Sequence, residues 1–304
     1  MIGTRRVFSS IGMPGLRSRS RRSARIAGTW FAACCACGSA ADTVRAQTPS
    51  PLAEWQYSAG VPLAKVLAPA QQPVWQIDTG AAVDLRPSYP GASAYRVRIG
   101  PSIDIRYRDL FFASTGEGIG VNVLRGPNWR VALSAGYDLG RRAADDLDHL
   151  RGMPNIGAAA LVRLAADYVI TKPFPWVARV AVRRDVGGAS GWRGDLSAYL
   201  PLPGSNERFF WFAGPSVTFA DARYMNAWFG VSDAQARAGE RRGYAPSAGL
   251  RSVAFGTTAV WFVDKHWFVT AAGAVEQLVG AAARSPLVTR STQAVVDVSI
   301  SYRF

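Results

Sequence analysis

Strict alternation of apolar and polar side chains constrains this chain more than any other feature. From Tyr95 to Tyr107 the odd-numbered positions are apolar or aromatic, and the even-numbered ones are polar, small or charged. Successive side chains of a β-strand point to opposite faces, at a rise of about 3.3 Å per residue. The segment is therefore predicted to be a strand with one apolar and one charged face. It is longer than the roughly five or six residues usual in soluble sheets.

The same period recurs along the chain. Further alternating segments lie at residues 128–140, 156–170, 176–185, 192–200 and 209–219, and breaks such as 201–206 and 263–266 fit the turns between them. Several apolar faces begin or end on an aromatic residue, as the two interfaces of a membrane select; examples are Tyr95, Tyr107, Trp129, Trp176 and Trp192. We therefore expect an all-β fold, a transmembrane antiparallel up-and-down β-barrel of about twelve strands, within a range of roughly ten to fourteen.

The last segment repeats the pattern up to the final residue. Its apolar face consists of Ala294, Val296, Val298, Ile300, Tyr302 and Phe304. A terminal Phe with an aromatic residue two positions earlier is similar to the C-terminal signal that the barrel-assembly machinery recognises, although Ser299 stands where that signal usually has Gly. We expect Ile300, Tyr302 and Phe304 to act as this assembly signal.

The parity of a position, odd or even along its strand, predicts which charged side chains face the barrel interior. The candidates are Arg96, Arg98, Arg106, Arg108, Arg130, Arg179, Arg183, Arg193, Asp138 and Asp167. If the lumen is open, these arginines favour anionic solutes. If it is closed, they pair as a polar plug with Asp104, Asp138, Asp167, Asp195 and Asp297. The sequence leaves both possibilities open.

A soluble alternative is an exported β-sandwich or a lipocalin-like barrel, in which the apolar face would point inward. The length of the strands and the number of arginines on one face argue against it. The chain also has no uninterrupted apolar run of about 18 residues, the minimum for a spanning helix.

The N-terminus has the three parts of a secretory signal. An Arg- and Ser-rich stretch precedes the apolar segment 26–41, and Val44-Arg45-Ala46 places small residues before Gln47. We expect residues 1–46 to be a signal peptide cleaved near Ala46/Gln47. Residues 47–304 would form the outer-membrane barrel, after a short irregular stretch to about residue 72. All three cysteines (Cys34, Cys35, Cys37) lie in the signal peptide. We expect no metal or cofactor site there, since no His follows at ligand distance.

Charge and residue content argue against a nucleic-acid-binding protein and against an enzyme. Residues 1–46 carry +7 of the formal charge of +14, and an exported chain is a poor candidate for a nucleic-acid partner. The two histidines, His149 and His266, have no nucleophile at a suggestive strand spacing, so we expect no enzyme. Gly116-Glu-Gly118-Ile-Gly120 fits a hairpin turn better than a phosphate loop. The acidic cluster Asp145, Asp146 and Asp148 fits a loop paired with Arg141 and Arg142 better than a cation site.

Several short motifs in the sequence resemble those of a known family. They are Pro87–Gly91; Arg106–Phe112; Gly140–Arg142 with Asp146, Leu150, Gly152 and Ile156; Trp228–Val231 with Ala234 and Ala236; and Ser285–Val288. In order and spacing, from about Gln76 to Phe304, they resemble the MltA-interacting protein (MipA/OmpV) family of outer-membrane proteins. Departures are Trp228, where the family more often has Tyr, and Ala282 and Ala283, where it has acidic residues.

The resemblance implies a non-enzymatic barrel in the cell outer membrane of a Gram-negative bacterium, in contact with its lipid. The family's named member is thought to scaffold a murein-degrading transglycosylase and a bifunctional penicillin-binding synthase, and other members are linked to adhesion and stress responses. Our first hypothesis is therefore a scaffold that holds such a murein hydrolase and synthase through its periplasmic turns. The alternatives are a channel for small anions and a surface adhesion protein that acts through long loops such as 232–247.

Overall fold

The computed structural model describes residues 73–206 and 208–304. The predicted signal peptide, its cleavage site and the irregular stretch to residue 72 lie outside the described residues. The first strand begins at Trp75, two residues after the first described residue.

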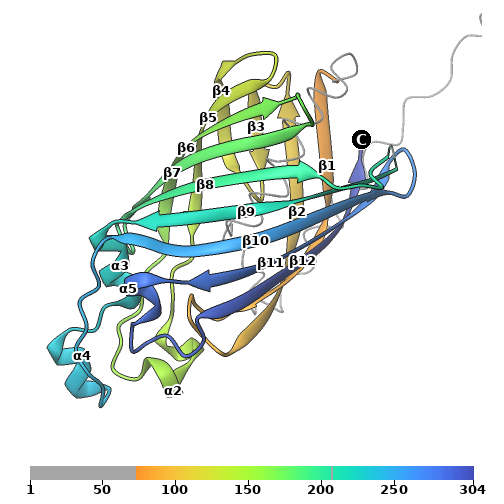
Figure 1. Cartoon of the computed structure of the whole chain (residues 1–304). Helices are drawn as coiled ribbons and strands as arrows, with labels where there is room; N and C mark the ends of the chain where they lie inside the picture. The colour runs from red at the N-terminus through yellow and green to blue at the C-terminus, as the bar shows by residue number, and fades with distance from the viewer. Residues whose placement is uncertain (1–72, 207) are drawn as a thin grey trace, which may run out of the picture. The chain divides into compact units, whose positions relative to one another are not determined.

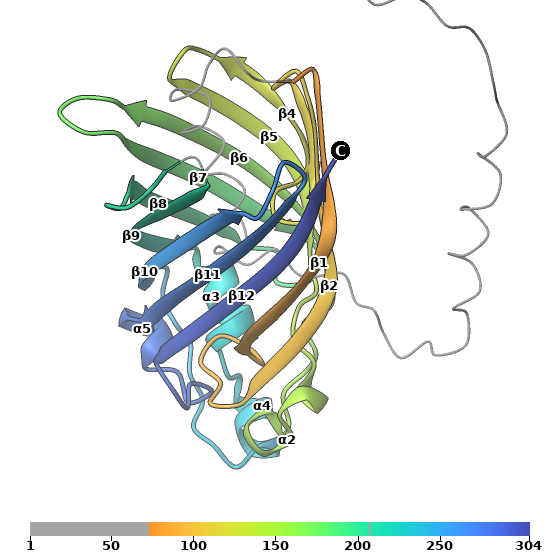
Figure 2. The ribbon, with the colours of Figure 1, turned by 90° about the vertical axis from the view of Figure 1, so that its right-hand side faces the viewer.

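Twelve strands form one closed sheet in the described part of the chain (Figure 1). The strands are β1 (Trp75–Pro87), β2 (Tyr95–Tyr107), β3 (Phe111–Ser114), β4 (Gly118–Arg125), β5 (Trp129–Asp138), β6 (Ala159–Ile170), β7 (Trp176–Val186), β8 (Trp192–Pro201), β9 (Phe209–Ala220), β10 (Gly249–Phe262), β11 (Trp267–Leu278) and β12 (Thr292–Arg303). Each strand pairs antiparallel with its neighbours in sequence, and β1 pairs with β12 to close the barrel (Figure 2). The predicted up-and-down barrel of twelve strands is confirmed.

The predicted strand over 95–107 matches β2, and most other strands begin and end within one or two residues of the alternating segments. The largest difference is at the start of β6, at Ala159 rather than Ile156. Ile156 instead forms an isolated antiparallel bridge with Arg141, which joins the two arms of the β5–β6 loop. Two turns follow the prediction: 263–266 joins β10 to β11, and the glycine-rich segment 116–120 covers the end of the turn between β3 and β4 and the start of β4.

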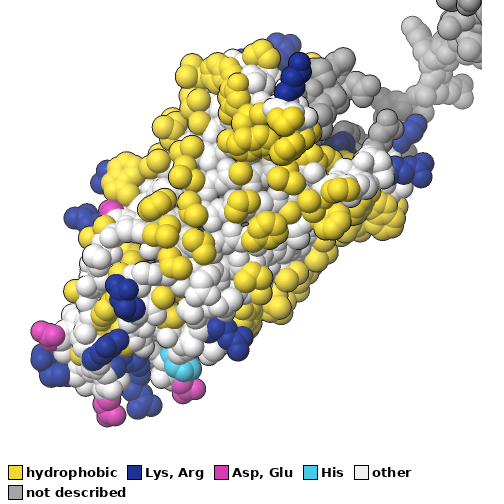
Figure 3. Space-filling view, in the orientation of Figure 1, with side chains coloured by type: hydrophobic (Ala, Val, Ile, Leu, Met, Phe, Trp, Pro, Cys, Tyr) yellow, Lys and Arg dark blue, Asp and Glu magenta, His cyan; other side chains and the backbone are white. Residues whose placement is uncertain are grey.

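The outer face of the barrel is apolar. Val97, Ile99 and Ile103 of β2 are exposed, whereas Asp104 and Arg106 of the same strand are buried inside. Figure 3 shows apolar side chains spread over the strands, with Lys and Arg visible at both ends of the barrel and most of the visible Asp and Glu at the end that carries α2 and α4. An apolar outer face and a charged interior are typical of barrels that are surrounded by lipid. The soluble alternative would have the opposite arrangement, with its apolar face pointing inward.

The two ends of the barrel differ. At the end where β1 begins and β12 ends, which we call the terminal end, the connections are tight turns such as 108–110, 126–128 and 263–266. At the opposite end, which we call the cap end, the loops 139–158, 221–248 and 279–291 are long and contain all the helices of the described residues. The helices are η2 (Ala143–Asp145), α2 (Leu147–Leu150), α3 (Ala222–Phe229), α4 (Asp233–Ala238) and α5 (Gly280–Ala283). None of the helices within 73–206 and 208–304 is long and apolar enough to cross a membrane.

The β3–β4 hairpin is much shorter than its neighbours. β3 pairs with β2 only from Asp104 to Tyr107, so the hairpin turn lies partway along the wall of the barrel rather than at its end. Gly118 in this turn has a φ of +78°, and a Cβ there would lie 2.2 Å from the carbonyl oxygen of Ala135. Glycine therefore lets the chain turn back close to β5, which brings the neighbouring Glu117 into the barrel interior.

Candidate functional site: the charged interior and its cap

The interior of the barrel holds most of the charged side chains that parity selects. Those less than a tenth exposed are Arg106, Arg130, Arg179, Arg183, Arg193 and Asp167. Asp138 lies among them at the cap end of β5, where its side chain is 13% exposed. Alternation along each strand accounts for this arrangement, because the opposite face of every strand is covered by apolar residues that face outward.

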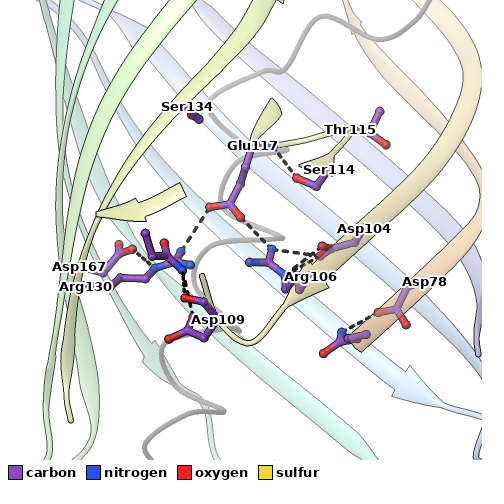
Figure 4. Close-up of polar contacts among 12 residues, drawn as sticks. Asp78, Asp104, Arg106, Asp109, Ser114, Thr115, Glu117, Arg130, Ser134 and Asp167 are labelled. Carbon is purple, nitrogen blue, oxygen red and sulfur yellow. Dashed lines mark hydrogen bonds and ion pairs between the residues drawn. The ribbon is translucent and has the colours of Figure 1, made fainter. Parts of the chain in front are cut away.

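Glu117 is the centre of a continuous network of ion pairs (Figure 4). Its two carboxylate oxygens lie 2.8 Å from Nη2 of Arg106 and 3.3 Å from Nη2 of Arg130. Arg106 also pairs with Asp104 at 2.9 Å, and Arg130 pairs with Asp167 at 2.8 Å. The network therefore connects β2, the β3–β4 turn, β5 and β6.

The Glu117 network extends further around the wall. Asp167 accepts a hydrogen bond from Nη1 of Arg179 on β7 at 3.3 Å. Nη2 of Arg163 on β6 donates to the backbone carbonyl of Glu117 at 2.5 Å, and its Nε donates to Oγ of Ser134 at 3.1 Å. A charged side chain loses its hydration when it is buried. Because the cations and carboxylates are buried together, each charge is stabilised by a partner of opposite sign.

A second group of ion pairs lies toward the cap end. Arg183 pairs with Asp195 at 2.5 Å, and Arg193 pairs with Asp185 at 2.7 Å and with Asp138 at 3.4 Å. Asp195 also accepts a hydrogen bond from Oγ1 of Thr218 at 2.7 Å. Further inward pairs in the described residues are Arg86–Asp84, Arg251–Glu276 and Arg303–Asp78.

Three of the arginines selected by parity lie elsewhere. Arg108 falls in the turn after β2, with a φ of +48°, and its exposed guanidinium lies 5.4 Å from the centre of the Tyr107 ring. The strand ends one residue earlier, so parity no longer sets the direction of this side chain. Arg96 and Arg98 lie near the cap end and are only half-buried; Arg96 pairs with Asp145 of the β5–β6 loop at 2.9 Å.

An apolar core fills the cap end of the barrel. Five loops contribute to it, at residues 88–94, 139–158, 187–191, 221–248 and 279–291, together with adjoining strand ends. We call this core the cap; it consists of Tyr89, Ala92, Leu150, Met153, Ile156, Ala189, Ala220, Tyr224, Met225, Trp228, Phe229, Val231, Leu278, Ala281, Ala282 and Leu287. Burial of this many apolar side chains holds the five loops together.

Local hydrogen bonds begin the two longest helices of this end. The side chain of Asp221 accepts a hydrogen bond from the backbone N–H of Tyr224 at the start of α3. Ser232 and Gln235 form a capping box at the start of α4. Such caps satisfy backbone donors that a helix leaves free, so these helices can form although they are only eight and six residues long.

Arg141 does not pair with the acidic cluster, contrary to the prediction. It is 1% exposed within the cap, where its guanidinium lies 5.8 Å from the Tyr89 ring centre and 6.0 Å from that of Trp228. Its Nη1 donates to the backbone carbonyl of Trp228 at 3.0 Å. Burial lowers the pKa of Arg141 to about 10, and burial raises the pKa of Tyr89 to about 12.

The remaining acidic and histidine candidates have structural roles in the loops. Asp145 pairs with Arg142 at 3.1 Å, as predicted. Asp146 caps α2 and lies 2.9 Å from Nδ1 of His149, a contact that the strand spacing did not suggest. The other histidine, His266, stacks on Tyr302 at the terminal end. Within 73–206 and 208–304, no group of three or more His, Cys, Asp or Glu side chains could hold a metal ion.

The last strand presents its aromatic residues on one face. Ile300 and Phe304 are exposed on the outer surface, and Tyr302 contacts both Phe304 and Trp267 edge to face, with ring centres 4.9 and 5.2 Å apart. The three residues that we expect to be the assembly signal therefore lie along the lipid-facing side of β12. Recognition by the assembly machinery stays a prediction.

Sequence reasoning missed Glu117 and the cap. Glu117 lies in a turn, where there is no alternation from which to assign a face, and its glycine-rich surroundings indicated only a hairpin. The cap draws its residues from five loops that are far apart in the sequence. The helical segment 222–229, which buries Tyr224, Met225, Trp228 and Phe229 on one side, is the signal that could have indicated part of it.

Comparison with known proteins gives one match by sequence and several by fold. A family model described as "MltA-interacting protein MipA" matches residues 79–304. No curated protein matches the chain.

Among the solved structures that resemble this one are bacterial outer-membrane proteins of low sequence identity. The translocator domain of the autotransporter NalP from Neisseria meningitidis is 11% identical, with a TM-score of 0.40, covering 81% of this chain and 94% of its own. The toluene transporter TodX of Pseudomonas putida is 11% identical, with a TM-score of 0.34, and the coverages are 79% and 93%. For OmpT of Vibrio cholerae the identity is 6%, the TM-score 0.32, and the coverages 77% and 99%.

Proposed function

Because this chain belongs to the MltA-interacting protein family, we propose that it is a non-catalytic scaffold of the cell envelope. It is an outer-membrane β-barrel, and its place would be the outer membrane of a Gram-negative bacterium. The partners that we propose are a murein-degrading transglycosylase and a penicillin-binding synthase, held at the periplasmic side of the barrel. The family's name refers to an interaction with one murein enzyme, and this observation carries the proposal.

The filling of the barrel supports a scaffold rather than a channel. Toward the terminal end the Glu117 network ties together the walls β2, β5, β6 and β7, and the apolar cap occupies the other end. In the described residues each of the deeply buried Arg106, Arg130 and Arg193 has a carboxylate partner. Such pairs offset the positive charge that an anion-selective lumen would need.

The terminal end provides the surface for the proposed partners. In bacterial barrels the short turns face the periplasm and the long loops face outward, which places the terminal end on the side of the peptidoglycan. Among the described residues, the turns of this end expose more cations than carboxylates. Their exposed cations in the described residues are Arg108, Arg125, Lys172, Arg208 and Lys265. A partner with an acidic surface would complement them.

Co-purification from detergent extracts of the native host tests this proposal. The full-length protein should enrich a murein-degrading transglycosylase and a penicillin-binding synthase. Charge reversal at two exposed terminal-end cations, Lys172→Glu with Lys265→Glu, should reduce that enrichment by an order of magnitude, because two attractive contacts become repulsive. Arg237→Glu is the matched control, since Arg237 is exposed on α4 at the cap end.

Two results would contradict the scaffold. One is the absence of both enzymes from extracts that contain the wild-type barrel. The other is a stable anion-selective conductance of the purified protein in planar bilayers, which would favour the channel instead. If the protein instead acts in adhesion through residues 232–247, it should bind to surfaces. Arg237→Glu should then weaken that binding, and Lys172→Glu with Lys265→Glu should not.

A further inference from the structure

The outer face of the barrel is hollowed at the cap end of β7, β8 and β9. The hollow is a groove of about 160 Å³, and its lining residues are Val182, Trp192, Arg193, Gly194, Phe219, Ala220 and Asp221. We call it the Gly194 groove.

A glycine forms the floor of this groove. Gly194 is the cross-strand partner of Val182 on one side and of Phe219 on the other, and both of these side chains are exposed on the outer face. A Cβ at Gly194 would meet no other atom within 4 Å. The apolar side chains on either side therefore leave open space between them, on a surface that faces lipid.

An arginine lies at the rim of the groove, two residues nearer to the cap end than Val182. Arg184 is the cross-strand partner of Trp192, and its guanidinium lies 5.1 Å from the centre of the indole ring. Its side chain is on the outer face, with Val182 and Val186 exposed before and after it on the same strand. Arginine on the lipid-facing side costs several kcal/mol at the membrane midplane and roughly 0–1 kcal/mol near an interface, so this position beside a tryptophan indicates the interface.

Arg184 is the cation of the groove that a ligand can use. Arg193 also lines the groove, but its guanidinium is bound to Asp185 and Asp138 inside the barrel. The carboxylate of Asp221 caps α3, where its Oδ1 accepts a hydrogen bond from the N–H of Tyr224 at 2.7 Å, and as an anion it is not a group that would bind a phosphate. Within the described residues Arg184 forms no ion pair with a carboxylate.

We propose that the Gly194 groove binds a membrane lipid that carries a phosphate headgroup. An acyl chain lies over Gly194 between Val182 and Phe219, and the phosphate contacts the guanidinium of Arg184 beside Trp192. The planar guanidinium matches two phosphate oxygens, and an aromatic ring next to it suits the depth of the headgroup. Since long loops of bacterial barrels face outward, the lipid belongs to the outer leaflet.

Native mass spectrometry of the full-length protein in detergent micelles, with lipid A as the probe, tests this proposal. The wild-type barrel should retain one lipid A more strongly than a lipid without net charge. Arg184→Gln should weaken retention about fivefold, the effect of one cation on an anionic headgroup. Gly194→Val should weaken it as well by filling the groove, and Gly194→Ala provides a milder filling that meets no neighbouring atom.

Arg108→Gln is the matched control. Arg108 is also an exposed arginine over an aromatic ring, at 5.4 Å from that of Tyr107, but it lies at the terminal end. Its substitution should leave lipid A retention unchanged. Inorganic phosphate in millimolar excess should not displace the lipid, because it has no acyl chain to occupy the groove. Heat-modifiable migration on a gel shows that each variant is folded.

Three results would overturn the proposal. The first is equal retention of lipid A by the wild type, Arg184→Gln and both Gly194 variants. The second is a loss with Gly194→Val alone, which would show an apolar groove that does not recognise a headgroup. The third is displacement by inorganic phosphate, which would identify the site as one for a free anion.

Discussion

The carboxylate of Glu117 lies 2.8 Å from the guanidinium of Arg106, although the two residues belong to different elements, a tight turn and a long strand. Side-chain exposure of the two is 1% and 9%, so the pair is shielded from water inside the barrel. A single acidic residue at the tip of a short hairpin thus joins the walls on both sides of it. Loss of the negative charge of Glu117 would leave the buried guanidinium groups of Arg106 and Arg130 with one carboxylate partner fewer.

Glu117→Gln should therefore destabilise the barrel strongly. The substitution preserves the shape of the side chain but removes the charge that faces Arg106 and Arg130. Breaking a buried ion pair on one side costs about 3–5 kcal/mol. Urea unfolding of the protein in lipid vesicles measures this loss. Glu240→Gln, at an exposed position of the cap end, should change the free energy of unfolding little. A loss below about 1 kcal/mol for Glu117→Gln would contradict the role that we assign to the network.

The cap should become less stable as the pH rises through the titration of Tyr89. Burial raises the pKa of Tyr89 to about 12 from its ordinary value near 10. In the unfolded chain the phenol therefore loses its proton first. The stability contribution is complete below about pH 10 and is lost as the pH approaches about 12; at most about 3 kcal/mol is involved.

Tyr89→Phe isolates this effect. Phenylalanine cannot titrate, so the drop in the free energy of unfolding between pH 9 and pH 11.5 should be smaller in the variant than in the wild type. The variant also loses the hydrogen bond from the Tyr89 hydroxyl to the carbonyl of Leu287, 3.1 Å long, which lowers its stability equally at both pH values. Parallel pH curves for the two proteins would show that Tyr89 is not shielded as described.

Gly80→Ala should prevent normal closure of the barrel. A Cβ at Gly80 would lie 1.9 Å from the backbone carbonyl oxygen of Ile300 on β12, so the first and last strands would have to move apart. Heat-modifiable migration on a gel should be reduced or lost, because that shift depends on a closed barrel. Gly194→Ala is the control, since it is also a strand glycine and its Cβ meets nothing within 4 Å. Equal gel shifts for the two variants would refute the close approach at Gly80.

Phe229→Ala should loosen the cap while leaving the strands in place. Phe229 is fully buried in the cap, and truncation of such a side chain costs about 3–5 kcal/mol. Limited proteolysis should then cut the segment 232–247 faster, with the gel shift of the barrel preserved. Val97→Ala, on the exposed outer face of β2, should leave the cutting rate unchanged. Identical rates for Phe229→Ala and the wild type would mean that the cap does not hold this loop.

Much of the fold was predictable because alternation is a local property. The strand from Tyr95 to Tyr107 and the closing segment that ends at Phe304 each identify their own two faces. Whether the apolar face points to lipid or to a core follows from the number of arginines opposite to it. The same reasoning assigned Arg106 and Arg130 to the charged face, and these two side chains are buried inside the barrel.

Alternation carries no information where a strand has ended. Arg108 continues the parity of β2, but a left-handed turn directs its side chain to the surface. Glu117 and Arg141 lie in connections, and their partners are chosen by packing between segments distant in sequence. Arg141 was predicted to pair with the neighbouring acidic residues, and instead the cap encloses it between Tyr89 and Trp228.

The amino-acid order alone therefore establishes that the chain forms long antiparallel strands with an apolar outer face and a charged inner one, since each side chain's face depends on its neighbours two positions away. Whether that charged interior is an open lumen or a filled one depends on contacts across the barrel. Folding brings the turn at Glu117 into the barrel interior and packs five separate loops against one another at the cap end. Those contacts depend on the lengths of hairpins and on packing in three dimensions, which no periodicity along the chain records.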